Sequence, residues 1–124
     1  MAWVNTGKLC PTGWYVPSDA EWTELTDYLG GESVAGGKLK ETGTTHWASP
    51  KTGATNETGF TALPGGYRYY DGTFYNIGDT GYWWSATENY ATHAWSRYMI
   101  YSISSVLRNY TNKEVGFSVR CLRD

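Results

Sequence analysis

The stretch that decides the fold is residues 82–123, YWWSATENYATHAWSRYMIYSISSVLRNYTNKEVGFSVRCLR. Within it, framework-like and surface-like residues alternate one by one in two successive runs. Strand side chains point to opposite faces in turn, so an alternation with a period of two predicts β-strands. The phase slips at residues 102–104, as it does at a hairpin turn or a bulge. We therefore predict two antiparallel strands with one face packed inward and the other offered to a partner.

The two faces of these strands differ in composition. The inward set is mostly large, apolar or basic and consists of Trp95, Arg97, Met99, Tyr101, Val106 and Arg108. The outward set consists of Ser96, Tyr98, Ile100, Ser105, Leu107 and Asn109. Residues 82–85, which include the pair of Trp83 and Trp84, and residues 116–121 have the pattern of fixed core strands. Binding is therefore expected in the segment between them, residues 89–111.

The aromatic content of the chain is high and of a particular kind. Aromatic residues make up 17% of the 124 residues, with 11 Tyr and 7 Trp against 3 Phe. Tyr and Trp combine a large apolar surface with a polar group and are enriched at recognition surfaces, whereas Phe suits a dry core. We expect the Trp side chains mostly inside and many Tyr side chains outside.

Length and net charge limit the number of domains and the kinds of partner that the sequence allows. A chain of 124 residues fits a single domain, residues 1–124, and such a domain can be the C-terminal part of a longer protein. The net charge is −2 and the ten basic residues form no stripe, so nucleic acid is not an expected partner. No apolar run is long enough for direct membrane insertion, and residues 1–3 show no signal sequence.

Two cysteines, Cys10 and Cys121, lie near opposite ends of the sequence. They are too few for a zinc cluster and suit a single disulfide that joins the ends of the domain. A disulfide indicates an exported protein, because cytoplasmic thiols are kept reduced. The alternative is a pair of buried free thiols in a reducing compartment.

Before the deciding stretch, the clearest local signal is a helix at residues 19–29. Ser18 and Glu21 form a capping-box pattern, and apolar residues follow at helical spacing. Asp19 and Glu21 also complement the helix dipole, and this role accounts for both carboxylates without catalysis. A glycine pair at residues 30–31 ends the helix.

The middle of the chain is predicted to be rich in turns. Residues 33–35 give one helical turn, which the next glycine pair breaks, and residues 38–40 enter a strand. Residues 60–63 form another short strand, and residues 67–70 and 73–75 form a hairpin around an Asp-Gly turn.

The sequence shows no pattern of catalytic or metal-binding residues. His46 has no second histidine or cysteine at ligand spacing. Asp71, Asn76 and Asp79 do not match the EF-hand spacing, so they are better explained as turn residues. No Ser/His/Asp arrangement, zinc-protease motif or phosphate loop occurs. We therefore expect no metal, no cofactor and no enzymatic activity.

Five segments carry a resemblance to a known family, in the order CPTGWYVPSDAEW, AGGKLKETGTTHW, GFTALPGGYR, GYWWSATE and GFSVRC. From about residue 5 to the C-terminus, the chain resembles the Fibrobacter succinogenes major paralogous domain. It is also similar to the formylglycine-generating-enzyme type of C-type-lectin-like fold. The resemblance implies an α+β domain with a twisted antiparallel sheet, one main helix near residues 19–29, long loops and adjacent termini. Tyr15 stands where members usually carry His or Arg. The family usually begins further upstream, and only residues 2–7 of that part are present here, so its first strands are either trimmed or lie in another part of a larger protein.

Domains of this kind are similar to variable proteins that retroelements diversify by mutating template adenines, chiefly in asparagine codons. The resemblance implies that the ligand-binding residues are of types that this mutation can reach. They are Asn89, Tyr90, Thr92, His93, Ser96, Tyr98, Ile100, Ser102, Ile103, Ser105, Leu107, Asn109, Tyr110 and Thr111. Trp95 and Met99, which are not reachable, lie between them.

Three hypotheses of function follow. The first is a non-catalytic receptor- or adhesin-type domain, on a cell surface or phage particle, that binds a protein or glycan of another cell through a Tyr/Ser/Asn-rich face. The second is a calcium-independent carbohydrate-binding module, in which Trp47, Trp95 and residues 67–70 stack on sugars. The third is an enzyme like the formylglycine-generating relatives, which needs reactive thiols, whereas Cys10 and Cys121 look structural.

Overall fold

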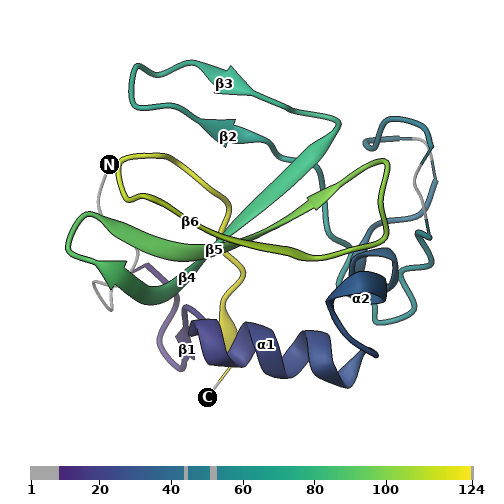
Figure 1. The fold of residues 1–124 in the computed structure, drawn as a ribbon, viewed down its shortest axis with the longest axis horizontal. Helices are drawn as coiled ribbons and strands as arrows, with labels where there is room; N and C mark the ends of the chain where they lie inside the picture. Colours follow the sequence, from purple (N-terminus) through teal and green to yellow (C-terminus); the bar gives the residue numbers. More distant parts are fainter. Residues whose placement is uncertain (1–8, 44, 51–52, 124) are drawn as a thin grey trace.

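The computed structural model describes residues 9–43, 45–50 and 53–123. These residues form an α+β fold with two helices and antiparallel strand pairs. The elements in chain order are β1 (Trp14–Tyr15), α1 (Asp19–Tyr28), α2 (Glu32–Leu39), β2 (Tyr67–Arg68), β3 (Phe74–Tyr75), β4 (Thr80–Tyr90), β5 (His93–Ile100), β6 (Leu107–Asn112) and β7 (Leu122–Arg123). The sheet β4–β5–β6 crosses the middle of the molecule, with α1 on one side and the hairpin β2–β3 on the other (Figure 1).

The central sheet confirms the antiparallel strands that the alternation predicts. In the β5–β6 pair, Ser96 lies opposite Asn109 and Tyr98 lies opposite Leu107. Opposed residues of neighbouring antiparallel strands share a face, so these members of the outward set lie together. Met99, from the inward set, is completely buried on the other face.

Helix α1 begins where the capping-box pattern predicts. The Ser18 hydroxyl accepts a hydrogen bond from the Glu21 N–H (3.1 Å), and the Glu21 carboxylate accepts one from the Ser18 N–H (2.9 Å). These bonds satisfy two N–H groups that have no partner within the helix. Neither helix in the described part of the chain has the length and apolar character needed to cross a membrane.

Helix α2 corrects the prediction of a single turn at residues 33–35 and a strand at residues 38–40. It runs through Gly36 and Gly37, which the sequence predicts as a break. A Cβ atom on Gly36 would lie 2.3 Å from the backbone oxygen of Ser105, so the helix and the β5–β6 connection touch there through bare backbone. Tertiary packing therefore outweighs the low helix propensity of glycine.

Two other predicted strands are wrong. Residues 60–63 contain one isolated bridge, between Ala62 and Lys40, and no strand. Residues 116–121 bridge β2 through Gly116 and β4 through Ser118. This segment passes from the hairpin to the sheet and pairs with each at a single residue, which is too little for a strand. The hairpin β2–β3 itself is confirmed, with shorter strands than predicted.

The main core lies between the central sheet and the helices. Its buried residues are Trp22, Leu29, Ala35, Leu39, Trp47, Ala62, Trp83, Met99 and Val106. The ends of the described chain meet beside it, because β1 pairs with β7 and Cys10 forms a disulfide with Cys121. The predicted disulfide is therefore confirmed, and the sequence contains no other cysteine.

Candidate ligand-binding face

The outward face of the central sheet looks toward the β2–β3 hairpin, and we call it the hairpin-side face. Strand alternation and register place on it Tyr82, Trp84, Ser96, Tyr98, Leu107, Asn109 and Thr111. Contact with the hairpin is direct, since the rings of Tyr82 and Tyr67 meet edge-on at a centroid distance of 5.3 Å.

Tyr82 is the centre of an aromatic cluster on the hairpin-side face. Its ring stacks on Phe117 at 4.9 Å and on Tyr98 at 5.6 Å. Tyr67, which meets Tyr82 edge-on, stacks in turn on Tyr75 of β3 at 5.3 Å. Each aromatic pair of this kind contributes about 0.5–1.5 kcal/mol beyond its burial. The cluster therefore fixes the hairpin relative to the sheet.

A hollow of about 300 Å³, the tyrosine hollow, opens between the hairpin and the sheet. It is lined by Tyr67, Tyr69, Asn76, Tyr82, Thr111, Val115 and Phe117. None of these side chains is charged at neutral pH; their polar groups are phenols, an amide and a hydroxyl. A second hollow of about 270 Å³ also borders Tyr67 and Phe117, so the recess continues past these rings.

The polar groups of the tyrosine hollow are held in place. Asn76 adopts a left-handed backbone conformation (φ 62°), which Asn tolerates well, and its amide donates a hydrogen bond to the Tyr82 hydroxyl (3.0 Å). Burial raises the pKa of Tyr82 and outweighs the opposing effect of this hydrogen bond. The phenol therefore stays protonated at neutral pH and keeps its own O–H donor.

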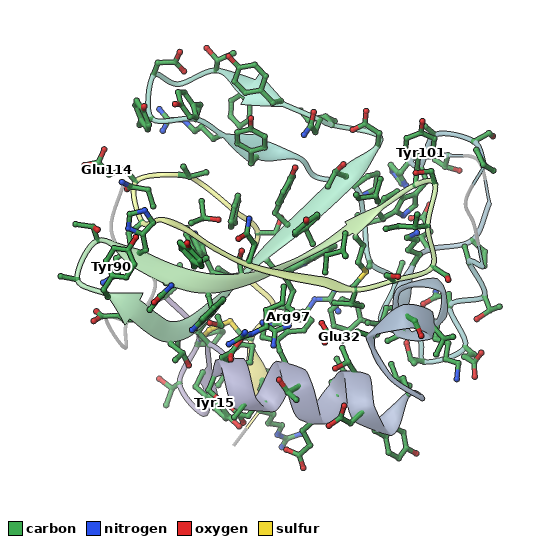
Figure 2. All side chains as sticks on the ribbon, viewed as in Figure 1. Tyr15, Glu32, Tyr90, Arg97, Tyr101 and Glu114 are labelled. Carbon is green, nitrogen blue, oxygen red and sulfur yellow. A yellow bond between two sulfur atoms is a disulfide. The ribbon has the colours of Figure 1, made fainter. Side chains whose placement is uncertain are left out.

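The opposite face of the sheet, the helix-side face, carries a second aromatic group. The ring centroids of Tyr90 and His93 lie 4.6 Å apart, and Tyr110 meets Trp95 edge-on at 5.5 Å. The Arg108 guanidinium covers the Trp95 ring at 3.5 Å. Figure 2 shows Tyr90 at the end of the β4–β5 hairpin, away from β2–β3.

Asp19, the first residue of α1, ties this helix to the helix-side face. Its carboxylate accepts hydrogen bonds from Arg97 (2.6 Å) and Arg108 (2.8 Å). Arg97 is 1% exposed and points from β5 toward α1 (Figure 2). Burial alone would raise the pKa of Asp19, but the hydrogen bonds and charges of Arg108 and Arg97 outweigh burial and lower it. The sequence predicts a role for Asp19 in complementing the helix dipole but gives no sign of these two ion pairs.

The predicted ligand-binding residues fall into three groups. The hairpin-side face holds Ser96, Tyr98, Leu107, Asn109 and Thr111. The β4–β5 hairpin and the helix-side face hold Asn89, Tyr90, Thr92, His93 and Tyr110. The end of β5 and the β5–β6 connection hold Ile100, Ser102, Ile103 and Ser105. The structure thus divides the single predicted surface between two faces and a loop.

One residue of the predicted set is less accessible than a displayed surface requires, and part of the set lies on a connection that is held in place. Ser96 is 1% exposed and donates a hydrogen bond to the backbone oxygen of Asn109 (3.1 Å), so it is not displayed, contrary to the prediction. The buried Lys40 ammonium donates to the backbone oxygens of Ile100 and Ile103. The β5–β6 connection is therefore anchored to the scaffold.

The tyrosine hollow includes residues that the prediction left out. The sequence predicts Tyr82 and Phe117 in fixed core strands, and it predicts Tyr67 and Tyr69 only as residues that stack on sugars. The signal that points to them is the density of Tyr on both sides of the Asp71–Gly72 turn, which is more than a two-stranded hairpin can bury.

The three predicted sugar-stacking sites differ in accessibility. Trp47 is 3% exposed and its indole N–H donates to the backbone oxygen of Ala62 (2.8 Å), so its ring is not available to a ligand. Trp95 has one ring face covered by Arg108. Tyr67 and Tyr69 line the tyrosine hollow.

These features define an α+β domain with a recessed, tyrosine-lined face. The family model described as the Fibrobacter succinogenes major domain matches residues 1–123, and the chain belongs to this family, as the ordered motifs predict. Neither a search of curated proteins nor a search of solved structures gives a match.

Proposed function

We propose that this protein is a non-catalytic binding domain whose ligand occupies the tyrosine hollow and the adjacent hairpin-side face. The observation that carries the proposal is a recess with aromatic walls and neutral hydrogen-bonding groups held in fixed positions. Small-molecule sites have this composition, and antibody paratopes use Tyr in the same way, because its large amphipathic ring loses little conformational entropy on binding.

The residues that line the tyrosine hollow also restrict the charge of the ligand group that can enter it. A charged group that entered the tyrosine hollow would lose hydration without meeting an opposite charge on the residues that line it. The ligand part that enters is therefore neutral, such as a saccharide ring or an uncharged peptide segment of a surface molecule. The volume of about 300 Å³ matches the lower end of known small-molecule sites.

We also infer that the fold is C-type-lectin-like and that the displayed residues are diversified by a retroelement. The antiparallel sheet, the helices packed on it and the disulfide-joined ends support the first inference. Tyr98, Leu107, Asn109 and Thr111 support the second, because all four lie on the hairpin-side face and are of reachable types. Export to a cell surface or phage particle agrees with the disulfide.

Genomic DNA tests the diversification. We expect a nearby template repeat that differs from this coding sequence at adenines, with the differences concentrated in the codons for residues 89–111. A template repeat whose differences avoid these codons, or no such repeat at all, would refute diversification and leave binding open.

Binding is tested by NMR with ¹⁵N-labelled protein and two ligand sets, neutral oligosaccharides and capped uncharged peptides. We expect at least one set to shift the amide signals of Tyr67, Asn76 and Thr111. Thr111→Arg places a long charged side chain in the hollow and should abolish these shifts. Thr42→Arg, on an exposed loop, is the matched control and should preserve them.

The outcome also decides the class of ligand. Shifts from the oligosaccharides alone indicate a calcium-independent lectin, and shifts from the peptides alone indicate a protein receptor. Shifts that cluster elsewhere, or that persist in Thr111→Arg, contradict the assignment of the tyrosine hollow as the binding site. No shifts from either set contradict the proposed binding of neutral ligands.

A further inference from the structure

A separate cavity of about 90 Å³ lies between α1 and the C-terminal segment. Its walls are mainly apolar and come from Pro17, Trp22, Leu25, Phe60 and Leu122. Two charged residues, Glu21 and Arg120, also border it. It shares no lining residue with the tyrosine hollow.

Arg120 is a half-buried cation that no carboxylate of the described residues pairs with. Its guanidinium lies 3.9 Å over the Phe60 ring and donates a hydrogen bond to the Phe60 backbone oxygen (2.9 Å). No ion pair links Arg120 to any acidic side chain within the described residues. Burial lowers the pKa of its guanidinium, as expected for a cation without an anionic partner. An anion placed beside the guanidinium would form charge-assisted hydrogen bonds with it and would neutralise a half-buried charge.

Trp22 contributes a wall of the cavity and buries its indole N–H. The residue is 3% exposed, and its indole nitrogen is buried without an acceptor within the described part of the chain. A buried N–H group without a partner is costly, and such groups are uncommon in folded proteins. Trp22 also forms a wall of the cavity, but its indole nitrogen is buried and is not accessible to a ligand there, so Arg120 is the polar group that selects the ligand.

Glu21 borders the same cavity but forms no ion pair with Arg120. Its carboxylate already accepts hydrogen bonds from the Ser18 N–H (2.9 Å) and the Tyr15 hydroxyl (2.5 Å). Burial raises the pKa of Glu21, but these hydrogen bonds outweigh burial and lower it, so it stays ionised as part of the helix cap. The two charges that border the cavity therefore differ: the Glu21 carboxylate is engaged in hydrogen bonds, whereas the Arg120 guanidinium has no ion-pair partner among the described residues.

We propose that this cavity binds a small aliphatic carboxylate, with the carboxylate on Arg120 and the aliphatic part against Leu25, Phe60 and Leu122. The volume of about 90 Å³ accommodates a short branched chain and excludes a long fatty acid. The same chemistry is offered by a free short-chain acid and by the C-terminal leucine or valine of a peptide. This site is independent of the tyrosine hollow and of the ligand proposed for it.

The test is an NMR titration of the whole chain with isovalerate and, separately, with the neutral isostere isovaleramide. Because the ligand is small, we expect millimolar affinity for isovalerate. The amide should bind at least about tenfold more weakly, because it lacks the charge-assisted hydrogen bonds. Acetyl-glycyl-leucine, titrated in the same way, shows whether a peptide C-terminus enters the site.

Variants test whether isovalerate binds in this cavity or elsewhere on the surface. Leu25→Phe fills the cavity and should abolish binding, whereas Leu63→Phe, at an exposed position outside it, should leave binding unchanged. Arg120→Met should remove the preference for the carboxylate over the amide; if this variant does not fold, Leu25→Phe carries the test alone. Thr111→Arg, which blocks the tyrosine hollow, should have no effect on isovalerate binding.

Binding of either carboxylate ligand that is lost in Leu25→Phe supports the proposal. Equal affinity for isovalerate and isovaleramide overturns it, and so does isovalerate binding that survives Leu25→Phe. Absence of binding by both isovalerate and acetyl-glycyl-leucine also overturns it. None of these results depends on whether the tyrosine hollow has a ligand.

Discussion

Lys40 lies just after helix α2, and its buried ammonium donates hydrogen bonds to the backbone oxygens of Ile100 and Ile103. It also lies 5.4 Å from the centroid of the Trp47 ring. Burial lowers the pKa of Lys40 from 10.5 to about 8. One side chain thus anchors the β5–β6 connection, at the cost of removing a cation from water.

Stability should rise between pH 7.5 and pH 9.5 because of Lys40. Its pKa in the folded protein, about 8, is below its pKa of 10.5 in the unfolded chain, so the unfolded chain binds more protons between these values. The free energy of unfolding therefore increases with pH in this window, by roughly 2 kcal/mol. Urea unfolding at several pH values measures it, and Lys40→Met, which cannot titrate, should flatten the dependence. An equal slope in both proteins would mean that Lys40 is not the source.

At the scale of elements, Asp19 connects the start of α1 to β5 and β6 through Arg97 and Arg108. Asp19→Ala leaves the buried Arg97 without a counter-charge, so we expect a loss of about 3–5 kcal/mol in the free energy of unfolding. Adding Arg97→Met should restore part of the loss. Glu24→Ala, at an exposed position on the same helix, should change stability by less than about 0.5 kcal/mol. A small effect of Asp19→Ala in chemical denaturation would show that the ion pair is not structural.

Two effects oppose each other at Gly36 of helix α2. Ala has a helix propensity about 1 kcal/mol better than that of Gly. Its Cβ would lie 2.3 Å from the Ser105 backbone oxygen, and backbone cannot rotate away as a side chain can. We expect the clash to win and Gly36→Ala to lower stability by about 1–3 kcal/mol. Gly65→Ala should be milder, because its Cβ meets only the Ser118 hydroxyl at 3.3 Å. Thermal unfolding of the two variants gives the comparison.

At the scale of the whole molecule, the Cys10–Cys121 disulfide closes almost the entire chain, with a sequence separation of 111. In the chain-entropy model, closing a loop of about this length stabilises a protein by about 4–5 kcal/mol. The Cys10→Ser/Cys121→Ser double variant should therefore lose much of its free energy of unfolding in guanidinium titrations. Reductant should destabilise the wild type and leave the double variant unaffected. A loss below about 1 kcal/mol would indicate that the β1–β7 pairing alone holds the ends together.

The fold was predictable where the signal is local. The capping box of Ser18 and Glu21 and the alternation in β5 and β6 involve residues close in sequence, and the structure confirms both. The predictions failed at Gly36–Gly37 and at residues 116–121. In both places, contacts with residues distant in the sequence outweigh the local propensity.

The candidate site was predictable only in part, because alternation along a strand is a local signal, whereas the packing of distant elements is not. Alternation correctly places Tyr98, Leu107 and Asn109 on one face. It cannot show that the β2–β3 hairpin lies over that face and contributes Tyr67 to the tyrosine hollow. Alternation also puts Tyr110, next to Asn109, on the opposite face, where it meets Trp95, although the predicted ligand-binding set includes both Tyr110 and Asn109.

Short patterns and ordered motifs encode the family, the main helix and the antiparallel pair β5–β6, so these follow from the sequence. The two cysteines suited a disulfide, but the pairing of Cys10 with Cys121 required the fold to bring the ends together. Tertiary structure alone decided which aromatic residues face a common hollow, and it alone left Arg120 half-buried without a carboxylate partner among the described residues. A recess forms only when elements distant in the chain are brought together. Its lining is therefore a property of packing, which no local pattern in residues 82–123 specifies.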